Sequence, residues 1–485
     1  MVKSLNKYFV LLVVIYTYTL HGQTFPVKTI LENGPRDKRI NLVFLGDGYQ
    51  ATEMNKYLSD VQSTTEKIFL ESPYKEYKSL FNVYAIEVPS KESGTDHPGT
   101  ASDCGSLKDS VFKKDTYFDT SFDASGIHRL LVANGYTKFF EVMKNNFPDY
   151  DIVLMVVNHP WYGGSGGSIA VFSANYSSAE VAIHETGHSF ARLADEYDYG
   201  YPQPGRYNGF NVTDRTSRDS IPWNAWINPT TPIPTPISGE FVSTVGLFEG
   251  AYYSSKGMYR PKISCKMRDL GVPFCEVCIE QHVRSMFDFI ELIEEHTPTA
   301  NYIELPSNEK RNFSIKQVQL PVGIVASEWL LDNKVILSNT NSFEIDGAAL
   351  TIGRHNLTAL VKHISPLVKN DPYNTLQRTV NWTIDVKTPT DIHNNNLPVE
   401  FSLEQNFPNP FNPSTTINYS LPEARHVTIK VFDVLGREVI ELVNEVKSQG
   451  NYSVKFDAHN LSSGLYIYTL RANSYSASKA MILAK

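Results

Sequence analysis

The chain has 485 residues, and its 41% hydrophobic and 20% charged residues are typical of folded globular protein. This length is enough for about three domains. The net charge is -8 and no run of Lys and Arg occurs, which argues against a nucleic-acid-binding protein, because a polyanion is bound by a basic surface.

The first residues predict an exported protein. Lys3 and Lys7 supply positive charge, an apolar run extends from Tyr8 to Leu20, and Gly22 follows. The run is shorter than the about 20 residues that a membrane-spanning helix needs. We therefore expect residues 1–22 to be a cleaved signal peptide rather than a membrane anchor, and no stable membrane span elsewhere.

Alternating strands and helices are predicted between residues 38 and 158. Apolar runs bounded by turn residues predict strands over 40–45, 81–88 and 151–158. Helical patterns are predicted over 54–70 and 128–146. Such alternation is typical of an α/β sheet.

The stretch after this sheet mixes loops with short elements. Residues 163–167 are glycine-rich, so we expect a flexible loop there. We expect a short strand over residues 168–173. If that strand is an edge, it can pair with an extended substrate backbone. Residues 197–243 predict a long functional or mobile loop, and 271–295 predict a helix.

The four cysteines are Cys104, Cys265, Cys275 and Cys278. An even number in an exported chain favours disulfide bonds, with three possible pairings. Cys275 and Cys278 also form a C-x-x-C motif, as in zinc knuckles and redox proteins. The second C-x-x-C half of a four-cysteine zinc site is missing from the sequence, so we expect structural disulfides.

A candidate metal site lies in residues 184–188. Ser177 and Glu180 fit a capping box, which predicts that a helix begins there. His184 and His188 are four residues apart, so both imidazoles share one helical face and can bind one zinc ion, Zn2+. Glu185 lies beside them and can act as the general base that activates water.

A catalytic zinc ion needs a third protein ligand. Asp195 is the favoured candidate and Glu196 the second, with a carboxylate further downstream as another alternative. In a continuous helix Asp195 would lie about 10 Å along the axis from His188, too far for a bond of about 2 Å. The helix must therefore end or turn between them.

Four other residues are weighed for roles at this site. Tyr197, Tyr259 and His282 are candidates for stabilising an oxyanion, although each is individually more typical of a structural residue. Met267 is a candidate for a methionine beneath the metal, and packing beside a disulfide explains it equally well.

The C-terminal part of the chain predicts two all-β modules. Short β-type runs recur over 297–386 and predict an immunoglobulin-like β-sandwich in which Trp329 is a core residue. Residues 387–397 form a polar linker, and 398–485 predict the second module, with strands over 427–431 and 466–470.

Three motifs resemble the IgA peptidase family of zinc metallopeptidases: HETGHSFARLADEY (184–197), NLVFLGDGY (41–49) and CKMRDLGVPFCEVC (265–278). The resemblance implies a metzincin-like α/β peptidase domain over 23–296. It implies His184 and His188 as zinc ligands, Glu185 as catalytic base and Asp195 as third ligand. Metzincins turn after the second histidine at a Gly, and residues 190–194 contain none.

The last module resembles the sorting domain of the type IX secretion system. The resemblance rests on 401–422, 427–439, 450–470 and the terminal Lys485. It implies a Bacteroidetes-type Gram-negative host, export through periplasm and outer membrane by the type IX machinery, and removal of residues 398–485. The mature protein is then secreted or lies on the cell surface.

Three functions compete for this sequence. The leading one is a secreted zinc-dependent endopeptidase that hydrolyses extracellular proteins or peptides. The second is a non-catalytic surface adhesin with a vestigial zinc site, against which the intact Glu185 argues. The third is an amidase that acts on cell-wall or glycopeptide substrates with the same metal chemistry.

Overall fold

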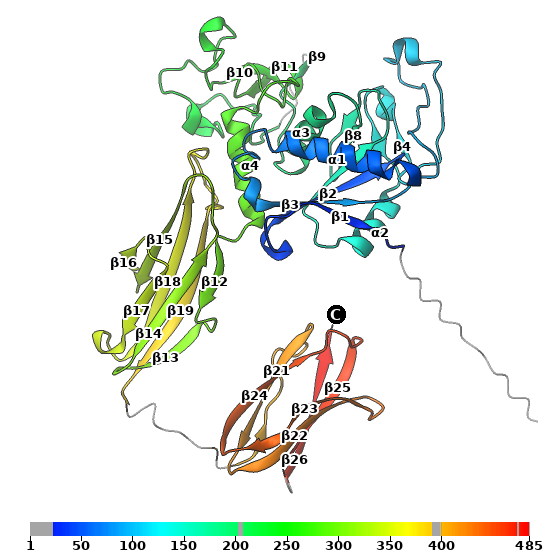
Figure 1. Ribbon diagram of the computed structural model, residues 1–485. Helices are drawn as coiled ribbons and strands as arrows, with labels where there is room; N and C mark the ends of the chain where they lie inside the picture. The colour runs from blue at the N-terminus through cyan, green and yellow to red at the C-terminus, as the bar shows by residue number, and fades with distance from the viewer. Residues whose placement is uncertain (1–22, 202–206, 390–397, 399, 473–474, 485) are drawn as a thin grey trace, which may run out of the picture. The chain divides into compact units, whose positions relative to one another are not determined.

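The computed structural model describes residues 23–201, 207–389, 398, 400–472 and 475–484 (Figure 1). The predicted signal peptide and residues 390–397 of the predicted linker lie outside them. The chain divides into two compact units. The first runs to Ile303 and includes Arg311–Ile345 and Arg354–Ile384, and the second contains Glu304–Lys310, Asp346–Gly353 and the chain from Asp385. Among the described residues, no helix is long and apolar enough to cross a membrane.

A six-stranded sheet forms the centre of the N-terminal domain, in the order β1-β3-β2-β6-β8-β7. Four strands run parallel: β2 (Ile40–Asp47), β3 (Phe81–Ile86), β6 (Ile152–Val157) and β8 (Ala170–Ser173). β1 (Val27–Leu31) and β7 (Gly164–Ser165) pair antiparallel at the two edges. Every residue of β2, β3 and β6 is buried, which explains their continuous apolar sequences.

Helices cover both faces of this sheet (Figure 1). Phe139 and Met143 of α2 (Tyr136–Asn146) belong to the same buried cluster as Val43 and Leu45 of β2. On the opposite face lie α1 (Met54–Ile68) and α3 (Ser178–Ser189), which contact each other. The domain is therefore a mixed α/β structure, as the alternating pattern predicted.

Two sequence predictions in this domain are wrong. The predicted helix over 128–146 begins only at Tyr136, and the preceding residues form β5 (Val132–Ala133), which pairs with β4 (Thr120–Ser121). Gly135, the residue before α2, lies against the Phe118 backbone. A side chain would clash there, because a Cβ would be 2.8 Å from the Phe118 oxygen. β8 is not an edge strand, because β7 pairs along its outer side with Gly164 opposite Phe172.

The predicted loop region from residue 197 is mostly irregular, and it contributes to a small sheet. β9 (Asp198–Tyr201) pairs parallel with β11 (Tyr253–Arg260), and β10 (Phe248–Ala251) pairs on the other side of β11. The domain ends with α4 (Glu276–Phe289), shorter than the predicted 271–295.

A β-sandwich module follows α4. One sheet has the order β12-β14-β17 and the other β13-β19-β18-β15-β16. The strands are β12 (Ile293–Thr297), β13 (Tyr302–Pro306), β14 (Lys310–Gln317), β15 (Ile324–Leu331), β16 (Lys334–Ser338), β17 (Ser342–Asp346), β18 (Gly353–Ile364) and β19 (Gln377–Lys387). Trp329 and Trp382 are buried and stack with ring centroids 5.9 Å apart, so Trp329 is the core residue that the sequence predicted.

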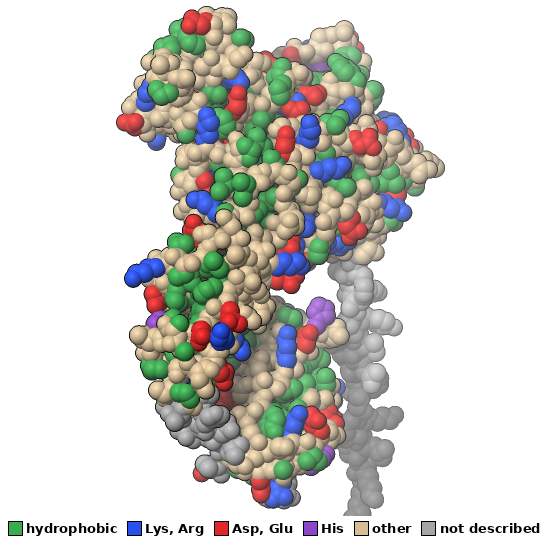
Figure 2. Space-filling view, turned by 60° about the vertical axis from the view of Figure 1, so that its left-hand side comes forward, with side chains coloured by type: hydrophobic (Ala, Val, Ile, Leu, Met, Phe, Trp, Pro, Cys, Tyr) green, Lys and Arg blue, Asp and Glu red, His purple; other side chains and the backbone are tan. Residues whose placement is uncertain are grey.

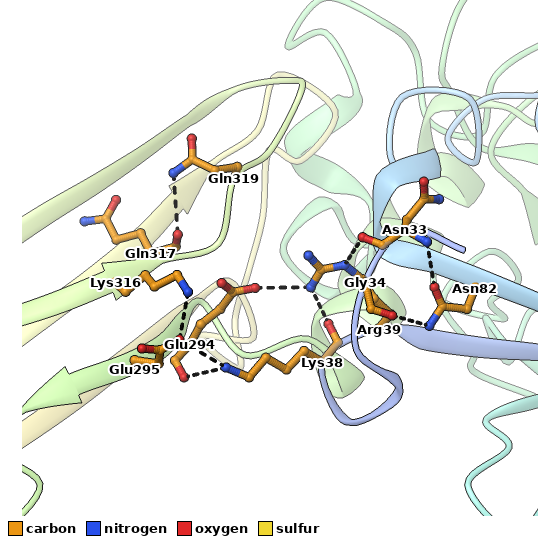
Figure 3. A network of polar contacts seen from close by, with 10 residues as sticks. All are labelled: Asn33, Gly34, Lys38, Arg39, Asn82, Glu294, Glu295, Lys316, Gln317 and Gln319. Carbon is orange, nitrogen blue, oxygen red and sulfur yellow. Dashed lines mark hydrogen bonds and ion pairs between the residues drawn. The ribbon is translucent and has the colours of Figure 1, made fainter. Parts of the chain in front are cut away.

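Ion pairs connect β12 to the N-terminal domain within the first unit (Figure 3). Arg39 Nη1 lies 3.1 Å from Glu294 Oε1, and Lys38 Nζ lies 3.7 Å from Glu295 Oε1. The arginine and Glu294 are both mostly buried. The predicted domain boundary between residues 296 and 297 falls inside β12.

The C-terminal module has one sheet in the order β20-β21-β24 and another in the order β23-β22-β25-β26. Its strands are β20 (Ser402–Leu403), β21 (Ser414–Leu421), β22 (Arg425–Asp433), β23 (Glu438–Lys447), β24 (Gly450–Asp457), β25 (Gly464–Ala472) and β26 (Tyr475–Leu483). β22 and β25 contain the two predicted strands, and their inward-facing residues share one buried cluster. Figure 2 shows acidic and basic side chains interspersed over the visible face of the described chain.

Candidate active site

The helix that carries the histidine motif begins at Ser178, as predicted, but without the predicted capping box. The Ser177 side chain makes no capping hydrogen bond. The Glu180 carboxylate instead accepts hydrogen bonds from Lys266 Nζ at 2.6 Å and from the Gly271 backbone N–H at 2.9 Å. This first turn is therefore fixed by the segment around Lys266.

His184 and His188 point their Nε2 atoms toward one place, 3.2 Å apart. His184 Nδ1 lies 2.9 Å from the Lys266 carbonyl oxygen, and His188 Nδ1 lies 2.8 Å from the Leu193 carbonyl oxygen. A carbonyl oxygen only accepts hydrogen bonds, so each Nδ1 carries a proton, and Nε2 is the nitrogen left to bind a metal. This is the tautomer that binds a metal through Nε2.

The chain reverses direction directly after this helix. Arg192 has a left-handed backbone conformation, with φ of 57°, and the Leu193 N–H donates back to the Gly187 oxygen at 2.8 Å. Metzincins make this turn at a Gly, which residues 190–194 lack, and in this chain Arg192 makes it instead. Such a conformation costs a non-glycine residue about 1–2 kcal/mol, which the surrounding hydrogen bonds offset.

This turn brings Asp195 to the two histidines. Asp195 Oδ1 lies 3.3 Å from His184 Nε2 and 3.2 Å from His188 Nε2. Atoms bound to one zinc ion at about 2.0–2.1 Å in tetrahedral geometry lie about 3.3 Å apart. Asp195 Oδ1 is buried and has no hydrogen-bond donor, while Oδ2 accepts from the Tyr253 hydroxyl at 2.5 Å. The three atoms thus form a triangle that fits one metal ion.

The electrostatics of these groups also favour a bound cation. Burial alone would raise the pKa of Asp195, but its close contacts with the His184 and His188 imidazoles outweigh burial and hold that pKa well below its usual range. Burial opposes protonation of His188, yet its contact with Asp195 raises the pKa of His188 to about 9. Positive charge is therefore stabilised between the three side chains.

Glu196, the second candidate ligand, lies elsewhere. It is completely buried, and its Oε1 accepts from Asn211 Nδ2 at 2.9 Å and from the Cys278 thiol at 3.2 Å. Burial raises the pKa of Glu196 well above its usual range. It belongs to a separate group of side chains with Cys265, Cys275 and Cys278.

Glu185 lies in the same cleft as the histidine pair. Its side chain is mostly buried, and a Cβ built on Gly166 would lie only 2.5 Å from Glu185 Oε2. Burial raises the pKa of Glu185, and the neighbouring His184 and His188 partly counteract this effect. A carboxylate with a raised pKa, held against a glycine backbone, is suited to taking and returning a proton.

The four side chains lie in a cleft of about 700 Å³. Residues 164–167 of the glycine-rich stretch line it; Gly164 and Ser165 form the short strand β7, while Gly166 and Gly167 are irregular, as the predicted loop implied. Tyr197 also lines the cleft, as its candidate role requires. Tyr259 and His282 do not, and His282 is completely buried, with Nδ1 donating to the Cys278 oxygen at 2.8 Å.

Arg129 and Tyr253 are among the polar residues of this cleft that sequence analysis missed. Arg129 Nη2 donates to the Tyr199 hydroxyl at 2.9 Å. Tyr253 has a left-handed backbone, with φ of 64°, and directs its hydroxyl to Asp195. Neither residue belongs to a recognisable motif, so only the tertiary fold reveals them.

The cysteines form no disulfide bond. All four lie in the described part of the chain, and each is a buried free thiol. Cys265 Sγ lies 3.6 Å from Cys278 Sγ, and Cys275 is in the same cluster. Cys104 lies in a different cluster with His97, Asp123 and His128. The expected two disulfides are therefore wrong, because three cysteines meet in one place and the fourth is elsewhere.

The family described as IgA Peptidase M64 matches residues 28–244 and 237–286, more than half of the chain. The chain belongs to this M64 peptidase family. Its N-terminal domain is thus that of a peptidase, a hydrolase of peptide bonds, and the family's members are metallopeptidases.

A second match covers residues 405–484 of this M64 protein, with the description secretion system C-terminal sorting domain. This is the type IX sorting domain that the sequence motifs indicated. It indicates export of the M64 protein to the cell surface or the medium.

Solved structures resemble parts of this M64 protein only weakly. Fibronectin(III)-like modules of Clostridium thermocellum CbhA are 15% identical and cover 19% of this chain and 96% of theirs, with a TM-score of 0.15. A Bacteroides ovatus glucan-utilisation protein, SGBP-B, is 11% identical over 40% of this chain and 46% of its own, with a TM-score of 0.14. Bacteroides uniformis β-glucuronidase 3 is 8% identical over 47% of this chain and 28% of its own, with a TM-score of 0.23. No curated protein matches the chain.

Proposed function

We propose that this M64 protein is an exported zinc-dependent endopeptidase. His184, His188 and Asp195 would hold the zinc ion, and Glu185 would be the general base. The observation that carries the proposal is the convergence of His184 Nε2, His188 Nε2 and Asp195 Oδ1 within 3.2–3.3 Å of one another, beside Glu185 in one cleft.

The donor set favours zinc among common metals. Two neutral imidazoles and one carboxylate, with a fourth position open to the cleft, match catalytic zinc sites. A bound zinc ion supplies Lewis-acid polarisation and makes water a nucleophile at neutral pH. The Lys266 and Leu193 carbonyls and the Tyr253 hydroxyl orient the three ligands.

Glu185 performs the proton transfers in this proposal. Its carboxylate accepts a proton from the attacking water and later donates that proton to the leaving amine. Burial raises the pKa of Glu185, which brings the group closer to the pH at which both transfers are efficient. Gly166 leaves room for the carboxylate at the cleft wall, because a Cβ there would lie 2.5 Å from Glu185 Oε2.

The rim of the cleft supports an extended polypeptide as substrate. β7 is the outermost strand of the sheet, and Gly164 to Gly167 line the cleft next to Glu185. The Gly164 backbone is already bonded to Arg129 and Leu131, so an extended chain would pair with the backbone that follows it, at Gly166 and Gly167, and pass its scissile bond in front of the ligands. Tyr197 and Arg129, which also line the cleft, are suited to donate hydrogen bonds to the carbonyl oxygen of that bond.

The test combines a digest with metal analysis on the purified full-length protein. Wild-type protein should cleave an unstructured peptide library and contain zinc, measured by elemental mass spectrometry. Glu185→Gln should lower kcat by about 10²–10⁴-fold and keep its zinc, because the amide cannot accept the proton. Glu66→Gln, on the exposed side of α1, is the matched control and should behave as wild type.

His184→Ala separates the competing functions. It should lose one zinc per chain and all cleavage. If His184→Ala retains the same zinc content as wild type, the proposed ligands are wrong. If zinc binds but neither peptides nor a cell-wall preparation is cleaved, the adhesin hypothesis replaces the peptidase. Cleavage of the cell-wall preparation alone identifies an amidase.

A further inference from the structure

A second group of potential metal ligands lies in the long connection between β3 and α2. Apart from the two-residue strands β4 and β5, this connection has only short turns. His97 is nevertheless completely buried, and Cys104 and Asp123 are almost completely buried. With His128 they place four ligand atoms within 4.8 Å of one another.

We propose that His97, Cys104, Asp123 and His128 form a second metal site, a structural zinc site. It would fix one wall of the active-site cleft. The proposal is independent of the function proposed above, because none of these side chains belongs to the histidine motif.

The distances between the four side chains agree with tetrahedral zinc coordination. His97 Nε2 lies 3.7 Å from Cys104 Sγ and 3.4 Å from Asp123 Oδ2. Cys104 Sγ lies 3.3 Å from Asp123 Oδ1 and 3.5 Å from His128 Nδ1. In a tetrahedral zinc site, pairs that include sulfur lie about 3.5–3.6 Å apart and pairs of N and O atoms about 3.3 Å apart. Two pairs are closer than these values, and both involve Asp123 Oδ1: His128 Nδ1 at 2.9 Å and Cys104 Sγ at 3.3 Å.

Neighbouring groups orient these ligands as they do in known metal sites. His97 Nδ1 lies 2.7 Å from the Ser110 carbonyl oxygen, so Nδ1 carries the proton and Nε2 faces the cluster with a lone pair. Asp123 Oδ2 accepts the Thr100 N–H at 2.8 Å. The backbone N–H of His128 donates to Asp103 Oδ1 at 2.8 Å, which fixes the position of that residue.

The chemistry of the set distinguishes a metal site from an ordinary Asp–His network. Two histidines and an aspartate can satisfy their hydrogen-bonding groups among themselves. A thiol is a weak donor and acceptor, so it would contribute little to such a hydrogen-bond network. A thiolate, two imidazoles and a carboxylate are all zinc ligands, and a site with four protein ligands is of the structural kind. Asp123 also has a left-handed backbone, with φ of 65°, which directs its carboxylate into the cluster.

Aromatic rings enclose the group. The His97 ring lies 5.0 Å from the Trp161 ring and 5.5 Å from the Phe112 ring, measured between centroids. Phe122 stacks on the His128 ring at 5.7 Å. An apolar surround of this kind restricts water and strengthens the interaction between a cation and its ligands.

The position of the group gives the metal a role in the active site. Ile127, Arg129 and Leu130, which flank His128, line the cleft. The Gly164 N–H donates to the Arg129 oxygen at 3.1 Å, so this wall is attached to β7. A metal bound to His128 would therefore hold Arg129 and β7 in place beside Glu185.

The test compares metal content between the purified wild-type protein and two conservative variants. Cys104→Ser and Asp123→Asn keep the size and hydrogen-bonding capacity of each side chain but remove a strong zinc ligand. Each should contain about one zinc ion fewer per chain than wild type. His184→Ala should lose a different zinc, so Cys104→Ser combined with His184→Ala should lose two. Because only differences are compared, metal bound by Cys265, Cys275 and Cys278 does not affect the result.

A second readout addresses the structural role. Limited proteolysis of Cys104→Ser should cut within residues 97–128 at least ten times faster than in wild type, located by peptide mapping. If either variant does not fold, wild-type protein is treated with a chelator and alkylated: Cys104 should react only after chelation. Equal zinc content in wild type and both folded variants would overturn the proposal, as would a Cys104 alkylation rate that the chelator leaves unchanged.

Discussion

Gly187, which precedes His188 in α3, is in direct contact with the side chain of Met267. A Cβ built on Gly187 would overlap the Sδ atom of Met267 and lie 3.2 Å from its Cε. Met267 is completely buried, and its carbonyl oxygen accepts the Glu196 N–H at 2.8 Å. The methionine therefore packs under α3 and also fixes the residue that follows Asp195. Met267 thus packs against the helix that carries the histidine pair, and its role beneath a metal stays a prediction.

This contact predicts the effect of Gly187→Ala. The added methyl group must displace a buried side chain, which costs about 1–3 kcal/mol, while alanine gains about 1 kcal/mol from its higher helix propensity. We expect a net decrease of about 1 kcal/mol in the free energy of unfolding and a loss of zinc affinity, measured by denaturant titration and competition with a chelator. Met267→Leu, which conserves volume, is the control. Wild-type zinc affinity in Gly187→Ala would show that the contact does not position the ligands.

Tyr253 is predicted to set the zinc affinity through Asp195. Its hydroxyl donates to Asp195 Oδ2 at 2.5 Å and leaves Oδ1 directed at the histidines. Removing such a neighbour of a metal ligand typically lowers metal affinity by about 10–100-fold. Tyr253→Phe should show this loss in a chelator competition, with kcat nearly normal at saturating zinc. Tyr259→Phe, whose side chain does not line the cleft, is the control and should keep wild-type affinity.

The sequence predicted the chemistry of α3 but not the turn after it. Whether His184 and His188 share one face of a helix depends only on helical periodicity, so it could be predicted from the sequence. The position of Asp195 depends on the left-handed conformation of Arg192, which no local rule assigns to an arginine. Glu180 fits a capping box in sequence, but its salt bridge with Lys266, 86 residues away, replaces that local bond.

The second ligand group shows the same limit of sequence analysis. His97, Cys104, Asp123 and His128 have no metal-motif spacing and lie in a segment without periodicity, part of which was predicted to be helical. Only the tertiary fold brings them together. The strands of the sheet could be predicted much more reliably, because β2 and β6 are buried along their whole length and are continuous apolar runs in the sequence.

The sorting domain leads to a prediction about export. Its core belongs to a buried cluster of its own, and none of its described residues lines the active-site cleft. A chain that ends at residue 398 should therefore retain full peptidase activity when purified, while it should accumulate in the periplasm. Immunoblots of periplasm, cell surface and medium measure the distribution. Surface exposure of the truncated protein would show that the module is dispensable for export.

His363 predicts how the stability of the first unit depends on pH. Its Nε2 lies 2.8 Å from the Tyr77 hydroxyl, and burial lowers the pKa of His363 to about 4. In the unfolded chain the pKa of histidine is about 6.5, so between pH 6.5 and 4 only the unfolded chain takes up the proton. The free energy of unfolding should therefore decrease as the pH falls through this window, by about 1.4 kcal/mol for each pKa unit.

His363→Gln tests this prediction, because glutamine can still bond Tyr77 but does not titrate. Denaturant unfolding at pH 8 is the control. At that pH residue 363 is uncharged in wild type and variant, so the two proteins differ only in the contacts that the substitution removes. Between pH 6.5 and 4, the variant should lose less stability than wild type, and the two curves should converge or cross. Parallel curves over the whole range would mean that His363 takes up its proton equally in the folded and unfolded states, and that its burial beside Tyr77 does not oppose the charge.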